Sequence, residues 1–562
     1  MRRTLAGASA ALVAALLAGC AGIPSSGSVH AGRQQAPADS LELELLASGP
    51  QAGADQAAIL RGFIDAATDA RNNYQVARDF LTPAFADEWR PDQGATIDVL
   101  ADREFRTIDA ASMRVDVVPT ASLGPNGEYQ LAASQTPIPL TYDFEQVDGQ
   151  WRISNAPPGI LIESSNFTRV FRSHTLIFLD PTEQYAVPDV RWFAGREVVQ
   201  TKVVRALLAG PVEWLRPGVV SAFPEEARLE ADAVPVSGGV ATVDLAGVSA
   251  EAPRDVQLMN YQLKTSLQGV RSVSDVELSL NDAIQNVPDL AVEPVVNPRV
   301  SSRPVVFDGA ALGHLPAGGD QVIPLAGISP QAVALAPTGA AIGPGGDEVA
   351  VRNAEGVSRI RAGEDPVPLD PRDGLIVPAI DAYGAVWSVP GERPDELIVV
   401  PAEGATVQLA VPWIGTSIAA LEVSRDGTRV IAMLAEGART RFLVTAVERD
   451  EAGTPVALGP EMLELAHVDG TPLDATWLDD HTVASLTATA QGTQVITQTV
   501  GGLDTPRAGP EDGVQILGGN SMRDLRVRTA EGNLDTQSGL GWQVQASGIR
   551  FVSVQMPESP MR

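Results

Sequence analysis

The chain has 562 residues, with 70 acidic against 40 basic side chains and a formal net charge of −30 at pH 7. A surface of this sign repels nucleic acid and anionic lipid headgroups, so the composition excludes nucleic acid as a partner. Hydrophobic residues make up 44% of the chain, which allows sizeable cores. Its length predicts about three or four domains. Only Lys202 and Lys264 are lysines, and Ala and Gly are abundant, as is typical of a GC-rich genome.

The first twenty residues have the pattern of a bacterial lipoprotein signal peptide. Arg2 and Arg3 precede an apolar run over residues 5–17 that is too short to span a bilayer. The run ends in Leu-Ala-Gly-Cys, which places leucine at −3, small residues at −2 and −1, and Cys20 at +1 of a lipobox. We therefore predict a signal peptide over residues 1–19, cleaved between Gly19 and Cys20. The alternative is an ordinary secretory signal followed by a chance cysteine.

Cys20 is the only cysteine and has no disulfide partner, so lipidation would give it a purpose. We expect it to become an S-diacylglycerol cysteine with an N-acyl group, which anchors the chain on the extracytoplasmic face of the cell membrane. Each buried methylene of the lipid contributes about 0.8 kcal/mol to this attachment. Residues 20–51 are rich in Gly, Ser, Pro and Gln and are expected to form a flexible tether, with a reach of roughly 30 Å.

Residues 52–165 combine a helix pattern with a later strand pattern. Apolar spacing over residues 59–67 predicts a helix, and Thr82-Pro83 predicts the start of another, with Thr as N-cap and Pro at its first position. After residue 110 the hydrophobic period is that of strands, and Asp148-Gly149 predicts a hairpin turn. Helices followed by an antiparallel sheet resemble the cone-shaped NTF2-like fold. A packed α+β support domain is expected here.

Residues 170–285 alternate strands and helices. Strands are expected near residues 176–178, 187–192, 240–245 and 276–280, and helices over 199–208 and 256–267. The segments FLD from Phe178, ALLAGP from Ala206 and VDL from Val243 resemble the module of spore-germination lipoproteins of the GerM type. That resemblance implies an α+β extracytoplasmic binding module without catalytic residues.

Residues 286–304 are rich in proline and predict an extended linker that makes few contacts. Beyond them, residues 305–562 show no helix pattern, and short strands alternate with turns. A loose repeat recurs at Thr338-Gly339, Tyr383-Gly384, Asp426-Gly427, Asp479-Asp480 and Gly519-Asn520.

Apolar hairpins that recur at the spacing of these turns predict an all-β propeller of five or six blades. A β-sandwich is the alternative fold. Strands near Val305–Phe307 or residues 322–323 are expected to pair with residues 551–554 and close the ring.

Motifs for catalysis and metal binding are missing from the sequence. Neither HExxH nor GxSxG occurs, and no calcium loop of the DxDxDG type is present. The histidines are His30, His174, His314, His467 and His481, none of which has a partner at metal-ligand spacing. We interpret His481, after Asp479-Asp480, as a solvated turn residue and Gly343-Pro344-Gly345-Gly346 as a turn rather than a phosphate loop. No catalytic residue, metal ligand or cofactor is therefore expected.

The order of parts resembles the LpqB lipoproteins of actinobacteria, which combine a lipobox, an N-terminal α+β domain, a GerM-like module and a propeller. That resemblance implies a non-enzymatic accessory of the Mtr two-component system. Its implied partner is the extracytoplasmic domain of the sensor histidine kinase, with effects on the cell envelope and division. Among functional residues only the lipidated cysteine carries over, onto Cys20.

Two other interpretations stay open. One is a lipoprotein that binds cell-wall polymer or a small ligand. The other is a propeller hydrolase or lyase with its site in the central channel. That site would need acidic, His or Tyr side chains clustered near the axis, and the sequence does not reveal such a cluster.

Overall fold

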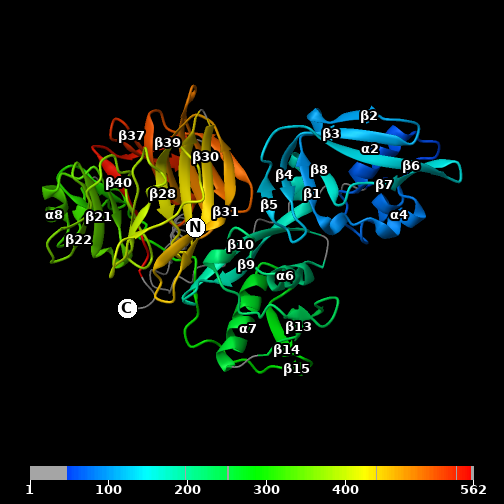
Figure 1. The fold of residues 1–562 in the computed structure, drawn as a ribbon, viewed down its shortest axis with the longest axis horizontal. Coiled ribbons are helices and arrows are strands. Elements are labelled where there is room, and N and C mark those ends of the chain that lie inside the picture. The colour runs from blue at the N-terminus through cyan, green and yellow to red at the C-terminus, as the bar shows by residue number, and fades with distance from the viewer. Residues whose placement is uncertain are drawn as a thin grey trace, which may run out of the picture. The chain divides into compact units, whose positions relative to one another are not determined.

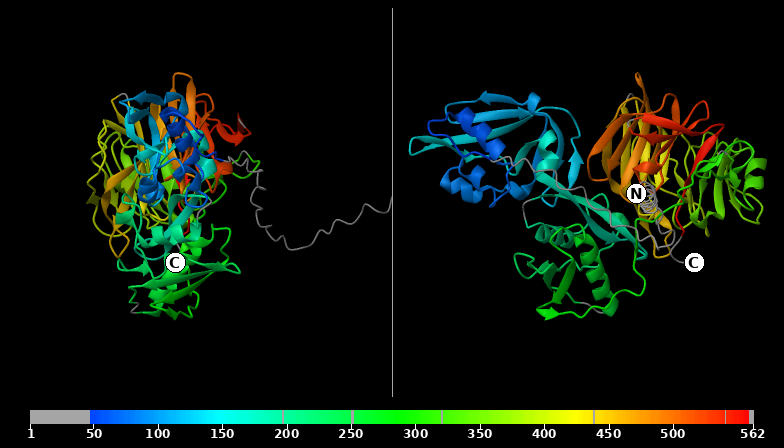
Figure 2. Two further views of the ribbon diagram at one scale, coloured as in Figure 1. Left: turned by 90° about the vertical axis from the view of Figure 1, so that its right-hand side faces the viewer. Right: turned by 180° about the vertical axis from the view of Figure 1, so that it is seen from behind.

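The computed structural model describes residues 47–195, 198–249, 252–319, 321–437, 439–539 and 541–558. The expected signal peptide, the cleavage site at Gly19 and Cys20, and all but the last five residues of the expected tether lie outside the described residues. We use three names below: the N-terminal module for residues 47–170, the middle module for 171–296, and the propeller for 305–558. Figures 1 and 2 show them in blue to cyan, cyan to green, and green to red.

Two helices of the N-terminal module have side-chain caps, one of them at the predicted residue Thr82. Asp55 caps the first helix by accepting a hydrogen bond from Ala58 N, and Thr82 caps another by accepting from Phe85 N, with Pro83 at its first position. The predicted apolar stripe of the first helix is buried. The helices are α2 Gln56–Ala66, α3 Gln75–Arg78, α4 Pro83–Glu88 and α5 Ser164–Val170.

Two four-stranded sheets form the rest of this module, in the orders β2-β3-β6-β7 and β5-β4-β1-β8. The predicted hairpin turn at Asp148-Gly149 joins β6 to β7, and both residues have the positive φ that such a turn requires. The strands are β1 Ala95–Asp98, β2 Glu104–Thr107, β3 Ser112–Val117, β4 Pro119–Leu123, β5 Tyr129–Leu131, β6 Ile138–Val147, β7 Gln150–Asn155 and β8 Ile160–Glu163. All pairs are antiparallel except β1 with β8.

The middle module contains the predicted strands and both predicted helices. Strands β13 and β14 pair in parallel, which requires a crossover, and α7 supplies it while packing against β9 and β14 (Figure 1). The elements are β9 Phe171–Leu179, β10 Tyr185–Ala194, α6 Val199–Leu208, β11 Arg228–Leu229, β12 Val236–Ser237, β13 Val240–Ala246, α7 Pro253–Leu267, β14 Asp275–Leu280, β15 Ala283–Ile284 and β16 Val295–Val296.

The Pro-rich segment 286–304 differs from our expectation of an extended linker with few contacts. Gln257 on α7 donates hydrogen bonds to the carbonyls of Pro288 and Asp289, and β16 then pairs in parallel with β10. Farther along, Asn520 of the propeller both donates to Val300 O and accepts from Val300 N, each at 2.9 Å. Proline removes only its own N–H, so its carbonyl and its neighbours are still able to bond. The segment is therefore fastened at both ends.

In the described part of the propeller, the strands form six four-stranded blades. Blade 1 is β40-β17-β18-β19, and blades 2 to 6 are β20–β23, β24–β27, β28–β31, β32–β35 and β36–β39. The inner strands β20, β24, β28, β32, β36 and β40 contact one another in a closed ring.

The strands of blades 1 to 3 are β17 Val305–Phe307, β18 Leu312–His314, β19 Ile323–Pro324, β20 Gly339–Ile342, β21 Glu348–Asn353, β22 Gly356–Arg361, β23 Val367–Asp370, β24 Ala379–Ile380, β25 Val386–Ser388, β26 Ile398–Val400 and β27 Val407–Gln408. Those of blades 4 to 6 are β28 Ser417–Val423, β29 Arg429–Glu436, β30 Arg439–Arg449, β31 Pro455–Val468, β32 Thr471–Trp477, β33 Thr482–Thr489, β34 Gly492–Thr499, β35 Asp504–Ala508, β36 Gly513–Leu517, β37 Arg526–Thr529, β38 Leu534–Ser538 and β39 Gly541–Ala546, and β40 Phe551–Gln555 completes blade 1.

The predicted closure of the ring is confirmed. Strand β40 pairs antiparallel with β17 in the register Val306↔Val552, and it pairs in parallel with β20 through Ala341↔Val554. Phe307 and Phe551 pack against each other across the first of these pairs, with ring centroids 5.0 Å apart. Blade 1 is thus built from the first and the last strands of the propeller.

Four of the five predicted repeat turns join the inner strand of a blade to its second strand, as expected. The first predicted turn, Thr338-Gly339, instead lies at the start of inner strand β20, and the turn after β20 is at Pro344–Gly346. The apolar run before Gly339 forms a short helix, α8 Ser329–Ala334, where no helix was expected. Periodicity alone does not distinguish such a short run from a strand.

Arg191 on β10 joins the N-terminal and middle modules. Its guanidinium is 1% exposed and donates to both carboxylate oxygens of Asp189, at 2.8 and 2.7 Å. It also donates to Glu128 Oε1 at 3.0 Å and to the carbonyl of Asn126 at 3.2 Å in the N-terminal module. A buried guanidinium is stable only with its acceptors in place, so this group holds the two modules in one arrangement.

Tyr383, in the first turn of blade 3, joins the middle module to the propeller. Its hydroxyl donates to Asp180 Oδ2 at 2.8 Å, and the Arg449 guanidinium lies 4.5 Å from the centroid of its ring. Gly427 and Gly453 lie against the ring so closely that a Cβ on either would come within 2.9 or 2.5 Å of it. The ring therefore occupies a slot that only glycine leaves open.

Candidate functional site

A cavity of about 330 Å³ occupies the central channel of the propeller. Residues from all six inner strands line it. Because inner strands of a propeller surround its axis, this cavity runs along the axis of the domain.

One side of the channel wall is apolar. Strands β20, β24 and β40 contribute small and branched aliphatic side chains to it, among them Ala341, Ile380, Val552 and Val554. The opposite side, from β28, β32 and β36, contributes Glu422, Asp474 and Gln515. The channel therefore presents a hydrocarbon surface opposite a polar one.

Glu422 and Asp474 each bridge to the neighbouring blade. Glu422 Oε2 accepts a hydrogen bond from Trp477 N at 3.1 Å, and Asp474 Oδ2 accepts from Ile516 N at 3.0 Å. The inner strands β28, β32 and β36 do not pair with one another edge to edge, so their N–H groups need other acceptors. Both carboxyl groups have this structural role in addition to any function in the channel.

Both carboxyl groups are harder to ionise than usual. Burial raises the pKa of Asp474 to about 7. Burial, and after it the negative charge of Asp474, raises the pKa of Glu422 well above its ordinary value. Perturbed carboxyl groups in a cavity mark a candidate functional site.

Several arginines surround these acids. Arg352, Arg528 and Arg550 line the channel, and Arg425 lies at the end where Glu422 is placed. Burial lowers the pKa of Arg528, an effect that the Asp474 charge opposes, and Arg528 donates to Gln515 Oε1 at 2.8 Å. The channel thus contains charges of both signs.

One end of the channel is covered by the Pro-rich segment. A small cavity lined by Val300, Glu422, Arg425 and Met556 lies there, and Arg425 donates to the carbonyl of Pro298 at 3.2 Å. At the other end Thr338 and Arg550, which precede inner strands β20 and β40, are exposed. Solutes therefore have access from the end where the inner strands begin.

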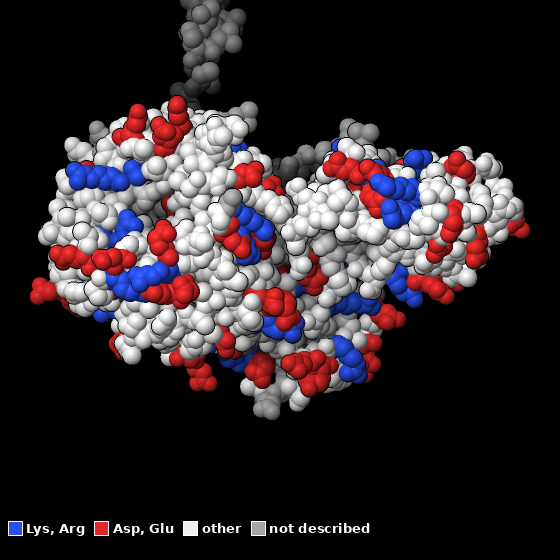
Figure 3. Space-filling view, turned by 45° about the horizontal axis from the view of Figure 1, so that its top comes forward, with Lys and Arg blue, Asp and Glu red and all other residues white. Residues whose placement is uncertain are grey.

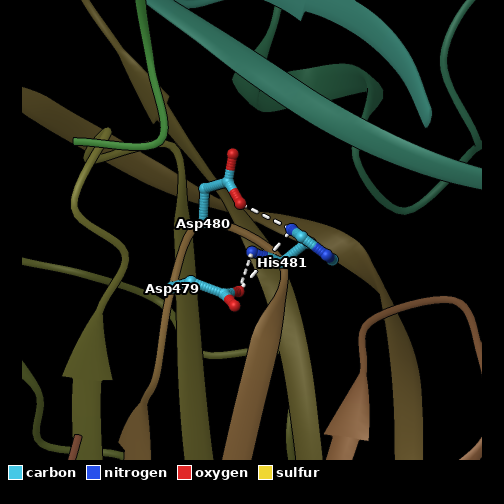
Figure 4. Close-up of side chains that lie close together, drawn as sticks. All are labelled: Asp479, Asp480 and His481. Atoms are coloured by element: carbon cyan, nitrogen blue, oxygen red, sulfur yellow. Dashed lines mark hydrogen bonds and ion pairs between the residues drawn. The ribbon is translucent and has the colours of Figure 1, made fainter. Parts of the chain in front are cut away.

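The turn Asp479-Asp480-His481 is a candidate metal-binding group, because its possible ligand atoms lie within 4.8 Å of one another (Figure 4). This corrects our expectation that no histidine has a carboxylate at ligand spacing. However, Asp479 Oδ1 already accepts from the backbone N–H groups of His481 and Thr482, and His481 Nδ1 lies 2.5 Å from Asp480 Oδ1. These contacts form a hydrogen-bonded turn.

His481 is not the solvated side chain that we expected, because it is half-buried. Burial opposes its protonation, but the hydrogen bond to Asp480 and the charges of Asp479 and Asp480 outweigh burial and raise its pKa. The turn at Gly343–Gly346 is confirmed, since it joins β20 to β21.

Glu422 and Asp474 were not predicted from the sequence. A signal was present for Glu422, which is the one charged residue of the largely apolar strand SIAALEV (β28), whereas Asp474 lies between threonines in TPLDATW (β32) and is harder to single out. Outside the channel, acidic and basic side chains are interspersed over the face shown in Figure 3.

Comparisons with known proteins cover three segments. Residues 49–168 match the family model described as the N-terminal domain of lipoprotein LpqB, and residues 315–551 match the LpqB beta-propeller domain. Residues 175–285 match the model named Germane, described as sporulation and spore germination.

Curated relatives named "Lipoprotein LpqB" match along much of the chain. The protein of Thermobifida fusca is 32% identical over 50% of this chain and 46% of its own length. The chain thus spans about half of that relative, and the same holds for the Cutibacterium acnes protein, at 48% of its length. The Mycobacterium paratuberculosis protein is 28% identical over 80% of this chain and 82% of its own. Among solved structures, a nidogen/laminin complex matches 42% of this chain and 88% of its own, at 11% identity and a TM-score of 0.30.

Proposed function

The chain belongs to the LpqB lipoprotein family, and on this basis we propose that it is a lipid-anchored accessory of a two-component system. In this proposal it binds the extracytoplasmic sensor domain of a histidine kinase and modulates its signalling. The observation that carries the proposal is the match of the N-terminal module and the propeller to LpqB domain models, with a Germane match between them, in an order that follows a lipobox.

Attachment to the membrane rests on Cys20. Among the described residues no helix is long and apolar enough to cross a membrane. We expect Cys20→Ala to prevent lipid transfer and to shift the protein from the detergent phase to the aqueous phase in detergent phase separation. A variant that still enters the detergent phase as fully as the wild type would show that the anchor lies elsewhere.

Binding of a protein partner is supported by the way the modules are joined. Arg191 and Tyr383 fasten the middle module to both neighbours, so surfaces from different modules keep a fixed arrangement. A preorganised surface binds without paying for the ordering of its parts. Lipid anchoring adds to this, because it confines both partners to the membrane and raises their effective concentration.

Calorimetry with the mature chain and the purified kinase sensor domain tests the contact. We expect saturable heat with a stoichiometry of one to one, and we expect deletion of the lipoprotein to lower phosphorylation of the response regulator in cells. An absence of heat at high micromolar concentrations, with both proteins folded, would refute the contact.

Polymer binding is a second candidate function, favoured by one feature of the middle module. A cavity of about 120 Å³ lies between α7 and residues 288–293, and its lining includes Asn260, Tyr261, Lys264 and Gln268. Amide, phenol and ammonium groups of this kind form hydrogen bonds with the hydroxyls of glycans. Co-sedimentation with purified cell-wall polymer, compared between wild type and Lys264→Ala, tests this candidate.

A further inference from the structure

The central channel of the propeller offers a binding site for a small molecule. Its cavity of about 330 Å³ has one aliphatic wall and, opposite to it, the carboxyl groups of Glu422 and Asp474 on neighbouring inner strands β28 and β32. Glu422 is 7% exposed, so water screens its charge poorly. A ligand for this cavity needs an apolar body and a polar group directed at the two acids.

We propose that the channel binds small organic amines, with the protonated amino group between Glu422 and Asp474 and the hydrocarbon part against Ala341, Ile380 and Val552. This site is independent of the contact with the kinase. An ammonium group has three donors and no acceptor, and a carboxylate has about four lone-pair positions for accepting. Glu422 accepts from Trp477 N and from the Thr476 side chain, and Asp474 accepts from Ile516 N and, through Oδ1, from Ala475 N, so lone pairs stay available on both acids.

The charges of the site favour a cation at this position. Both acids have a raised pKa, and the charge of Asp474 contributes to the shift at Glu422. A positive charge between the two acids would offset both the cost of burying their negative charges and the repulsion between those charges. The aliphatic wall favours an organic cation over a metal ion, because it provides no oxygen ligands.

The arginines of the channel are the competing feature, because they would attract an anion. Protein acceptors already hold two of them: Arg352 donates to Thr338 Oγ1 and to the carbonyl of Leu375, both at 3.1 Å, and Arg528 donates to Gln515 and to the carbonyl of Thr529. Arg425 is held by the carbonyls of Pro298 and Leu478. Arg550 is exposed at the entrance. An organic anion of the same size is therefore the decisive comparison.

Three probes of equal length distinguish these cases: hexylamine, hexan-1-ol and hexanoate, titrated into the mature chain at pH 8. We expect hexylamine to bind at least about tenfold more tightly than the other two, as a charge-assisted hydrogen bond provides. Equal affinities for the three probes would indicate that the channel binds only their hydrocarbon part. Tighter binding of hexanoate would assign the site to the arginines, and an absence of binding would exclude an amine site. Each of these results overturns the proposal.

Variants then place the amine. Glu422→Gln keeps an oxygen for Trp477 N, and we expect it and Asp474→Asn each to weaken hexylamine binding about tenfold while leaving hexanol unchanged. Glu448→Gln, an exposed residue on β30 of the same blade as Glu422, is the matched control and should bind like the wild type. Thermal unfolding of each variant verifies that it is folded. Loss of affinity in the control, or none in the channel variants, contradicts the proposal.

The pH dependence is an independent readout. Hexylamine stays protonated below pH 9, whereas Asp474 ionises near pH 7. Affinity should therefore rise between pH 6 and pH 8 in Glu422→Gln, where Asp474 is the remaining acid of the pair, and stay nearly constant in the double variant Glu422→Gln/Asp474→Asn. Glu422, whose own pKa is raised by burial, is replaced in both proteins, and the other charged group beside Asp474 is Arg528. An affinity of Glu422→Gln that is constant with pH would count against binding at Asp474.

Discussion

Replacing Arg191 by methionine tests whether the N-terminal and middle modules depend on one buried ionic group. Methionine keeps much of the aliphatic volume but removes two hydrogen bonds to Asp189 and one to Glu128. Asp189, only 4% exposed, would be left with Val212 N as its remaining donor, at 3.0 Å. Breaking a buried pair by removing one partner costs about 3–5 kcal/mol, so we expect a loss of that size in the free energy of unfolding.

Urea unfolding of the mature chain, followed by tryptophan fluorescence, measures this loss in the first transition. Arg216→Met is the matched control: Arg216 is exposed and paired with exposed Glu213, so it should cost less than about 1 kcal/mol. Adding Asp189→Asn to Arg191→Met should recover part of the stability, because no uncompensated charge then stays buried. A loss below about 1 kcal/mol for Arg191→Met would refute the reasoning that this pair holds the modules together.

Three further outcomes are expected. Tyr383→Phe removes the hydrogen bond to the buried Asp180 carboxylate, which is worth about 1.5–3 kcal/mol, and should split the calorimetric transitions of the middle module and the propeller; an unchanged single transition would contradict this. Asn520→Ala removes both bonds to Val300, so trypsin should cut faster after Arg299, as mass spectrometry of the fragments would reveal. Asp474 has a folded-state pKa raised to about 7, so its contribution to stability is greatest at low pH and is lost as the pH rises from about 4 to 7. Relative to Asp474→Asn, the wild type should therefore lose on the order of 2–4 kcal/mol over that window in urea titrations, and a constant difference would be evidence against the shift.

Local patterns were sufficient to predict the propeller and several elements of the two preceding modules, although helices α5 and α8 were not predicted. The hairpin at Asp148-Gly149 and the helix start at Thr82-Pro83 depend on a few neighbouring residues, so the sequence contains their cause. The recurring turns gave the period of the blades, and the apolar segments at the two ends of the propeller indicated which strands close the ring. Ring closure is a long-range contact, and the sequence left residues 305–307 and 322–323 as alternative partners of residues 551–554; the structure selects the first.

The remaining features depend on geometry that no short pattern encodes. Glu422 and Asp474 face the same channel because inner strands of neighbouring blades surround one axis, although 52 residues separate them in sequence. From the sequence alone Arg191 resembles a surface arginine on a strand. Its role in joining the two modules depends on Glu128, which comes from another module. The prediction that the Pro-rich segment makes few contacts was wrong. Composition indicates that the segment is stiff, but it does not reveal the hydrogen-bond donors that Gln257 on α7 and Asn520 direct at it.

The pairing of β40 with β17 has a consequence for biosynthesis. Val306 meets Val552, so the innermost position of blade 1 is filled only by residues made about 246 positions later. Contacts of such separation form late, because a long loop must close before they contribute any stability. A chain that emerges from an export channel in order would hold five complete blades and a strand β17 paired only with β18, whose inner edge stays unpaired until β40 arrives. Ribosomal stalling or proteolytic trimming before residue 551 would then leave an open ring with exposed strand edges, a species prone to aggregation and a ready substrate for proteases.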